Sequence, residues 1–151
     1  MRKYKDLLKT EVREFFRDFS GLGNILILTA IYSLVFEGRL FVLAIGGLAI
    51  TLLICYSIKV VFHRNRPLQM GFTNMLEKIQ SGSFPSVHSA EIMYSGLSVI
   101  FYINNVIVDA VSVMIILIVG YSRYHLKQHY TRDIIGGYFI GFAVFYLVFL
   151  S

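Results

Sequence analysis

Charged residues are scarce in this chain: they make up 15% of its 151 residues, whereas hydrophobic residues make up 56%. That composition is too apolar for an ordinary soluble domain of this size, so the sequence predicts an integral membrane protein. The one cysteine, Cys55, has no partner for an intrachain disulfide, and we expect it to be a small buried side chain. The first twenty residues lack an apolar core ahead of a cleavage site, so we expect no secretory signal.

No internal repeat or linker divides the chain, and its length fits one domain. The formal net charge is +5, but the basic residues cluster beside apolar segments and are not interleaved with polar loops. We therefore expect no nucleic-acid partner. The partners that the composition favours are the lipid bilayer and a ligand drawn from it.

Apolar segments recur along the chain, and five of them predict membrane-spanning helices. The first is short for a hydrocarbon core of roughly 30 Å. Residues 63–84 are polar and are expected to form a re-entrant or surface loop. The predicted fold is an all-α, integral membrane helical bundle. Its predicted spans are about 22–36, 40–62, 86–103, 106–121 and 133–150.

The N-terminal segment has a different pattern, in which apolar side chains recur at helical spacing between charged ones. This pattern predicts an amphipathic helix that lies in the membrane interface or packs on the rest of the protein. We expect an interfacial helix over 1–20 and a membrane-embedded domain over 21–151. The apolar residues are Tyr4, Leu7, Leu8, Val12, Phe15, Phe16 and Phe19.

Three short polar clusters interrupt the apolar chain. The second predicted span ends in the first cluster, the third begins at the second, and the last cluster joins the fourth span to the fifth. All three clusters therefore lie on one side of the membrane and can form one site. Charge beside hydrocarbon is expensive, so its concentration there indicates function. The clusters are Lys59-x6-Arg66-Pro67, Pro85-Ser86-Val87-His88 and Ser122-Arg123-x5-His129-x3-Asp133.

The cations of the first cluster suit an anionic ligand such as phosphate. Lys59 and Arg66 are about two helical turns apart, and Pro67 disfavours helix at the residue before it. Arginine can hold two phosphate oxygens, and lysine supplies a compact charge. For Arg64 and Lys78 we favour another role, in which their side chains extend to lipid headgroups.

The second cluster has the features of a helix start. Pro85 is tolerated in a first turn, and Ser86 is a good N-cap whose neighbouring backbone N–H groups can bind phosphate. His88 could donate a proton to a leaving oxygen. The alternative is a helix start beside an incidental histidine, and Glu91 can complement the helix dipole.

In the third cluster, His129 and Asp133 are four residues apart, so a helix would place them on one face. A carboxylate bonded to one ring nitrogen would fix the tautomer and leave the other nitrogen as a nucleophile or base. Arg123 could bind the same phosphate. The pair could instead ligate a metal, but no HExxH or further carboxylate cluster accompanies it, and we expect none. His63 and His125 are expected to be interfacial.

Taken together, the clusters resemble the signature of the type 2 phosphatidic acid phosphatase superfamily, integral-membrane lipid phosphatases related to vanadium haloperoxidases. That signature reads KxxxxxxRP, PSGH and SRxxxxxHxxxD in this order. The corresponding sequences here are KVVFHRNRP, PSVH and SRYHLKQHYTRD, spread over residues 59–133.

The resemblance implies a metal-independent lipid phosphatase without a cofactor. His129 would attack phosphorus to form a phosphohistidine, Asp133 would orient it, and His88 would protonate the leaving oxygen. The substrate would be a polyprenyl (di)phosphate such as undecaprenyl diphosphate, phosphatidic acid or a phosphatidylglycerophosphate-like lipid, entering sideways from the bilayer. The residues expected to hold the phosphoryl oxygens are Lys59, Arg66, Ser86 and Arg123.

One departure from the signature leaves two branches open. Val87 stands where the family usually has glycine, and it would be strained if the backbone required a positive φ. Headgroup phosphotransferases on the same fold often have PSxH with an apolar x, and HYTRD resembles their HYTxD. The preserved KxxxxxxRP and SR elements favour hydrolysis. A non-catalytic membrane scaffold is a third reading, which the full motif set disfavours.

The basic residues outside the clusters are distributed asymmetrically between the two sides. With five spans, the far side holds only Arg39, so the positive-inside rule favours a cytoplasmic active site in the cell membrane. Many relatives act on the outer face, so the resemblance points the other way. The basic residues on the active-site side are Arg2, Lys3, Lys5, Lys9, Arg13, Arg17, Arg64, Lys78, Lys127 and Arg132.

Overall fold

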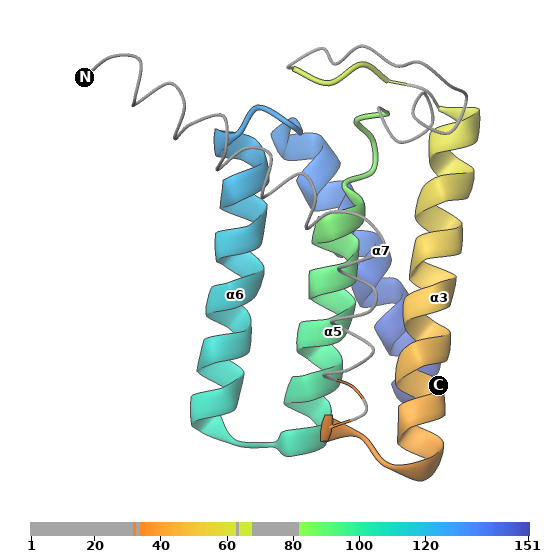
Figure 1. Ribbon diagram of the computed structural model, residues 1–151, viewed down its shortest axis with the longest axis vertical. Coiled ribbons are helices and arrows are strands. Elements are labelled where there is room, and N and C mark those ends of the chain that lie inside the picture. Colours follow the sequence, from red (N-terminus) through yellow and green to blue (C-terminus); the bar gives the residue numbers. More distant parts are fainter. Residues whose placement is uncertain (1–31, 33, 63, 68–81) are drawn as a thin grey trace.

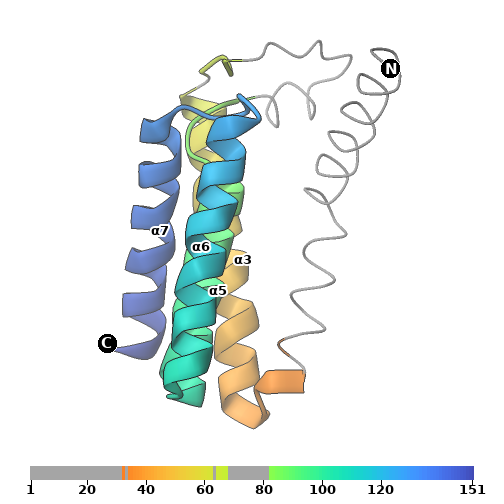
Figure 2. The same ribbon diagram turned by 90° about the vertical axis from the view of Figure 1, so that its left-hand side faces the viewer.

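The computed structural model of the protein describes residues 32, 34–62, 64–67 and 82–151 (Figure 1). Over these ranges the fold is all-α and contains no strand. It consists of four long helices that run roughly side by side, as two perpendicular views show (Figures 1 and 2). The helices are α3 (Gly38–Val61), α5 (Val87–Ile103), α6 (Val106–His125) and α7 (Thr131–Phe149).

The four helices correspond to the last four predicted spans, with boundaries that differ by a few residues at most ends. The largest difference is in α6, which continues to His125. Ser122 and Arg123 therefore lie in the last turn of a helix and not in the connection that we expected. The first predicted span falls almost wholly outside the described residues, as do the N-terminal helix, His63 and Lys78.

Helices α3, α6 and α7 are each long and apolar enough to cross a membrane. Helix α5 is shorter, at 17 residues, and it packs against all three (Figure 1). Its central position explains why it carries many small and hydroxylated buried side chains. They include Ser89, Ala90, Ser95, Gly96 and Ser98.

Close approach of α5 and α7 depends on two glycines. A Cβ atom at Gly137 would lie 2.4 Å from the carbonyl oxygen of Ser86, and one at Gly141 would lie 2.4 Å from that of Ala90. Small residues let the backbones of membrane helices approach in this way. This contact sets the distance between the two helix N-termini that carry Ser86 and Asp133.

Large apolar side chains are exposed along the outer faces of the helices. On α6 they include Met114, Leu117 and Ile118, and on α3 they include Val42 and Leu53. Exposed apolar surface of this extent matches helices that face lipid, as expected of a membrane protein.

The three clusters lie at one end of the bundle, as the order of the spans predicted. The C-terminal ends of α3 and α6 and the N-terminal ends of α5 and α7 meet there, at the top of Figure 1. Short turns precede α3 and join α5 to α6 at the opposite end. Gly38 and Asn104 both adopt positive φ there, at 55° and 47°, and Arg39 follows the first of them.

The glycine contact yields a stability prediction. We expect Gly141→Ala to lower the free energy of unfolding by about 1–3 kcal/mol, because the opposing atom is a backbone oxygen that cannot rotate away. Gly46→Ala is the matched control, because a Cβ atom there would meet nothing within 4 Å. Thermal unfolding in detergent measures both. Equal midpoints for the two variants would contradict this packing.

Candidate active site

Buried cations surround the site. Lys59 is 2% exposed and its Nζ donates to the carbonyl of Gly82, while Arg123 is 6% exposed. Lys59, Arg66 and Arg123 all act electrostatically on both His88 and His129. The structure thus brings together residues from all three clusters. Cations held out of water at one point favour an anionic ligand.

Two of the buried polar atoms at this point are available to a ligand. Neither His88 Nε2 nor Arg123 Nε has a hydrogen-bond partner among the described residues. The Arg123 side chain is held at its other end, where NH1 donates to Gln128 Oε1 at 2.8 Å. Buried polar groups are nearly always paired, so a bound phosphate is a natural partner for both atoms.

The second cluster forms the start of α5 as predicted. Ser86 is the N-cap, and its hydroxyl accepts from the backbone N–H of Ser89 at 3.4 Å and from the Ser89 hydroxyl at 2.9 Å. Val87 is the first helical residue, and it is not among the residues with positive φ. Valine is therefore unstrained at the position where the signature has glycine.

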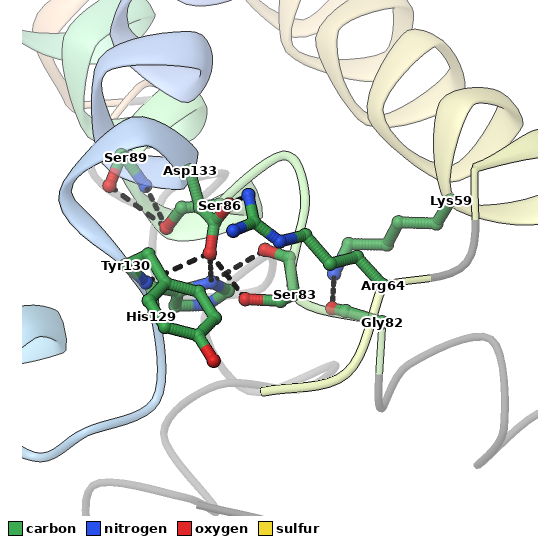
Figure 3. A network of polar contacts seen from close by, with 9 residues as sticks. All are labelled: Lys59, Arg64, Gly82, Ser83, Ser86, Ser89, His129, Tyr130 and Asp133. Atoms are coloured by element: carbon green, nitrogen blue, oxygen red, sulfur yellow. Dashed lines mark hydrogen bonds and ion pairs between the residues drawn. The ribbon is translucent and has the colours of Figure 1, made fainter. Parts of the chain in front are cut away.

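His129 does not lie on α7, which begins two residues later with Tyr130 as its N-cap. The expected His–Asp pair on one helical face is therefore wrong in its geometry. His129 Nδ1 lies 4.0 Å from Asp133 Oδ2 but only 2.7 Å from the carbonyl oxygen of Ser83 (Figure 3). Since a carbonyl can only accept, Nδ1 carries the proton and Nε2 carries the lone pair.

The Asp133 carboxylate is fully buried and is satisfied by groups other than the imidazole. Oδ2 accepts from the hydroxyl of Ser83 and from the backbone N–H of Tyr130, the latter at 2.8 Å. Oδ1 lies 3.3 Å from Arg64 NH1. A carboxylate in the first turn of α7 is also stabilised by the helix dipole.

Arg64 belongs to this network and was not predicted to do so. Its guanidinium pairs with Asp133 and lies 4.6 Å from the centroid of the Tyr130 ring (Figure 3). The expected contact with lipid headgroups is therefore not the contact that the structure shows. Its proximity to Arg66 in sequence was the only signal available, and that signal does not distinguish a partner of Asp133 from a headgroup contact.

Ser83 and Gln128 were also missed, because neither matches a motif of a catalytic chemistry. Gln128 immediately precedes His129, and Ser83 lies two residues before Pro85. Glu91 was expected to complement the start of α5. It instead lies beyond the first turn, where it is 4% exposed and acts electrostatically on Arg123.

The surroundings of His129 keep its ring neutral. Burial is the largest cause and the nearby Arg66 and Lys59 add to it, lowering the pKa of His129 to about 3 from an ordinary value of 6.5. Burial also lowers the pKa of Arg66. A neutral imidazole among cations combines a nucleophilic lone pair with a site for anionic oxygens.

The lowered pKa predicts how stability depends on pH. Below pH 6.5 the unfolded chain binds a proton at His129 that the folded chain excludes, so the stability contributed by the neutral ring is lost as the pH falls toward 3. We expect the loss at this residue to approach about 1.4 kcal/mol per pH unit. His129→Asn should unfold with a weaker pH dependence than the wild type.

Thermal unfolding in detergent between pH 7 and 5 measures this difference. The control is His125→Asn, because His125 is exposed and stacks on Tyr121 at the end of α6. The same pH dependence in all three proteins would show that His129 titrates normally.

Comparison with protein families agrees with the site. The family model of the PAP2 superfamily matches residues 40–151, which include most of α3 and all of α5, α6 and α7. No curated protein and no solved structure matches the chain. The matched range covers most of the chain and contains all three clusters, and the chain therefore belongs to the PAP2 superfamily.

Proposed function

We propose that the protein is a membrane phosphatase that hydrolyses a lipid phosphate or diphosphate through a phosphohistidine at His129, without a metal. The observation that carries the proposal is the buried bond from His129 Nδ1 to the Ser83 carbonyl. It leaves the lone pair of the ring on Nε2, in a site where three buried or half-buried cations act electrostatically on the imidazole. Membership of the PAP2 superfamily supports a phosphatase in general.

In the first step, Nε2 of His129 bonds to phosphorus and the bond from phosphorus to the leaving oxygen breaks. His88, which is protonated in the complex with the anionic substrate, gives its proton to that oxygen, and this prevents the build-up of an alkoxide or phosphate trianion. The ring gains positive charge as the new bond forms, and the Ser83 carbonyl stabilises it through Nδ1–H. Lys59, Arg66 and Arg123 offset the charge on the phosphoryl oxygens.

In the second step, water attacks phosphorus and gives a proton back to His88. The bond between phosphorus and Nε2 breaks, and its electron pair returns to the nitrogen. Inorganic phosphate leaves, and both histidines are again in their starting states. Ser86 assists both steps, because it places its hydroxyl and the first N–H groups of α5 beside the phosphate.

The substrate we favour is a lipid because the site lies at the end of a bundle whose outer faces are apolar. A soluble phosphate would not require such a scaffold. The candidate substrates are a polyprenyl (di)phosphate, phosphatidic acid and a phosphatidylglycerophosphate-like lipid. With five spans, the expected excess of basic residues on the active-site side supports a cytoplasmic orientation in the cell membrane.

Transfer of the phosphoryl or headgroup to an alcohol is the alternative that the sequence HYTRD and the apolar Val87 favour. Val87 is weak evidence for transfer, because it occupies an ordinary helical position. Phosphate release from each candidate lipid, with and without an alcohol acceptor, separates the two reactions. An absolute requirement for the alcohol would contradict hydrolysis.

Removal of the nucleophile tests the proposed chemistry. We expect His129→Asn to lower phosphate release by more than about 1,000-fold, because asparagine has no ring nitrogen that can attack phosphorus. The assay uses purified protein, the candidate lipids and excess chelator, and the chelator should leave wild-type turnover unchanged.

The matched control for that assay is again His125→Asn, which should retain turnover. Wild-type activity in His129→Asn would contradict the covalent step. Intact biological activity in a variant without turnover would instead support a scaffold. Loss of wild-type turnover in chelator would contradict the metal-independent reaction.

A further inference from the structure

We propose that Ser83 is a positioning residue that holds the nucleophilic histidine, and that Asp133 acts on His129 through Ser83 instead of directly. The inference rests on the proposed function, because it takes His129 as the nucleophile. It adds a residue outside the three clusters to the machinery of the reaction. It also changes the role that the resemblance implies for Asp133.

Each polar group of Ser83 is bound to a different part of the site. Its backbone N–H donates to the carbonyl of Arg64 at 2.7 Å, its carbonyl accepts from His129 Nδ1 at 2.7 Å, and its hydroxyl donates to Asp133 Oδ2. Ser83 is fully buried, so water does not compete for these groups. The two bonds made by the N–H and the hydroxyl determine where the carbonyl points, and the carbonyl determines where the imidazole points.

The Asp133 carboxylate is held away from the ring by its other partners. The Ser83 hydroxyl and the Tyr130 N–H both occupy Oδ2, and Arg64 faces Oδ1. The remaining separation of 4.0 Å between Nδ1 and Oδ2 is too long for a hydrogen bond. Asp133 therefore fixes the Ser83 side chain, and Ser83 fixes the ring.

This indirect arrangement has a chemical advantage over a direct pair. A carbonyl selects the same tautomer as a carboxylate does, but it brings no full negative charge to the ring. The ring therefore stays neutral and nucleophilic in a site where a bonded carboxylate would favour the imidazolium. The charged or titratable groups around His129 are Lys59 on α3, Arg66 after it, His88 on α5, Arg123 on α6 and Asp133 on α7 with its partner Arg64.

Removal of the Ser83 hydroxyl should reverse this arrangement. In Ser83→Ala, Oδ2 loses one donor and can turn toward Nδ1, which it already approaches to 4.0 Å. A carboxylate bonded to the ring stabilises the imidazolium, so the pKa of His129 should rise. In Ser83→Ala/Asp133→Asn the rise should disappear, because the amide carries no charge.

Nitrogen NMR of histidine-labelled protein in detergent measures this without any substrate. His129→Asn assigns the signals. We expect wild-type His129 to be the neutral Nδ1–H tautomer from pH 8 to 5, and Asp133→Asn to keep that tautomer. A change of tautomer in Asp133→Asn would overturn the proposal, as would a His129 pKa in Ser83→Ala that equals the wild-type value.

Kinetics provide the second arm. We expect Ser83→Ala to lower kcat by about 10- to 100-fold with little change in KM, because the nucleophile is misplaced while the cations that bind phosphate remain. The acidic limb of its pH–rate profile should move to higher pH. Ser98→Ala is the control, since it removes an equally buried hydroxyl on α5 that donates to the Tyr94 carbonyl and belongs to none of the three clusters.

The two arms separate the inference from the proposed function. A wild-type protein without turnover on any lipid phosphate would refute the function, and NMR would still decide the role of Ser83. A lower kcat with an unmoved acidic limb would show that Ser83 is merely structural and would overturn the proposal. The same loss of kcat in Ser98→Ala would overturn it as well.

Discussion

The neutral state of His129 is the constraint on which the site depends. Its ring is 3% exposed and is surrounded by Lys59, Arg66 and Arg123, so protonation would add a fourth positive charge to the site. The Ser83 carbonyl satisfies the one ring proton and fixes the tautomer. In the proposed reaction, an anion that enters this site gains the cations as partners and meets His129 as an uncharged nucleophile. Binding and reaction thus draw on the same electrostatic arrangement.

The helical bundle maintains this arrangement by joining two helix N-termini. The backbone N–H of Ser86 donates to the carbonyl of Asp133 at 2.9 Å, which links the start of α5 to the start of α7. Gly137 and Gly141 allow the two helices to approach closely enough for that bond. Arg123 lies at the end of α6, and the chain turns back after this helix. The backbone N–H of His129 therefore lies 3.3 Å from the Arg123 carbonyl. Packing in the membrane region therefore controls geometry at the bundle end.

The sequence was sufficient for the helices and for the convergence of the clusters. Apolar runs between polar turns define α3, α5, α6 and α7, and the alternation of their directions brings the clusters to one end. Ser86 was recognisable as an N-cap because that role depends on local chemistry. The position of His129 was not predictable, because the spacing of four to Asp133 suits a helix, and the helix begins only after Tyr130.

The bonds that orient the His129 ring could not be predicted from the sequence for a related reason. Ser83 and Arg64 both lie outside the four described helices, so no periodicity places their side chains. Which group accepts from Nδ1 is decided by differences of about 1 Å between competing partners. Spacing along the chain does not resolve such a difference. The charge of Asp133 suggested a direct bond to His129. In the structure the Ser83 hydroxyl and the Tyr130 N–H bind the carboxylate, and the imidazole bonds to the Ser83 carbonyl.

Trapping of the covalent intermediate tests the role of His129 at the level of a single atom. Wild-type protein is mixed with a lipid phosphate at pH 7, quenched in alkali within milliseconds and digested for mass spectrometry. We expect one phosphoryl group on Nε2 of His129 and none in His129→Asn. A phosphoryl group on another residue, or phosphate release at the full rate with no labelled histidine, would contradict nucleophilic attack by His129.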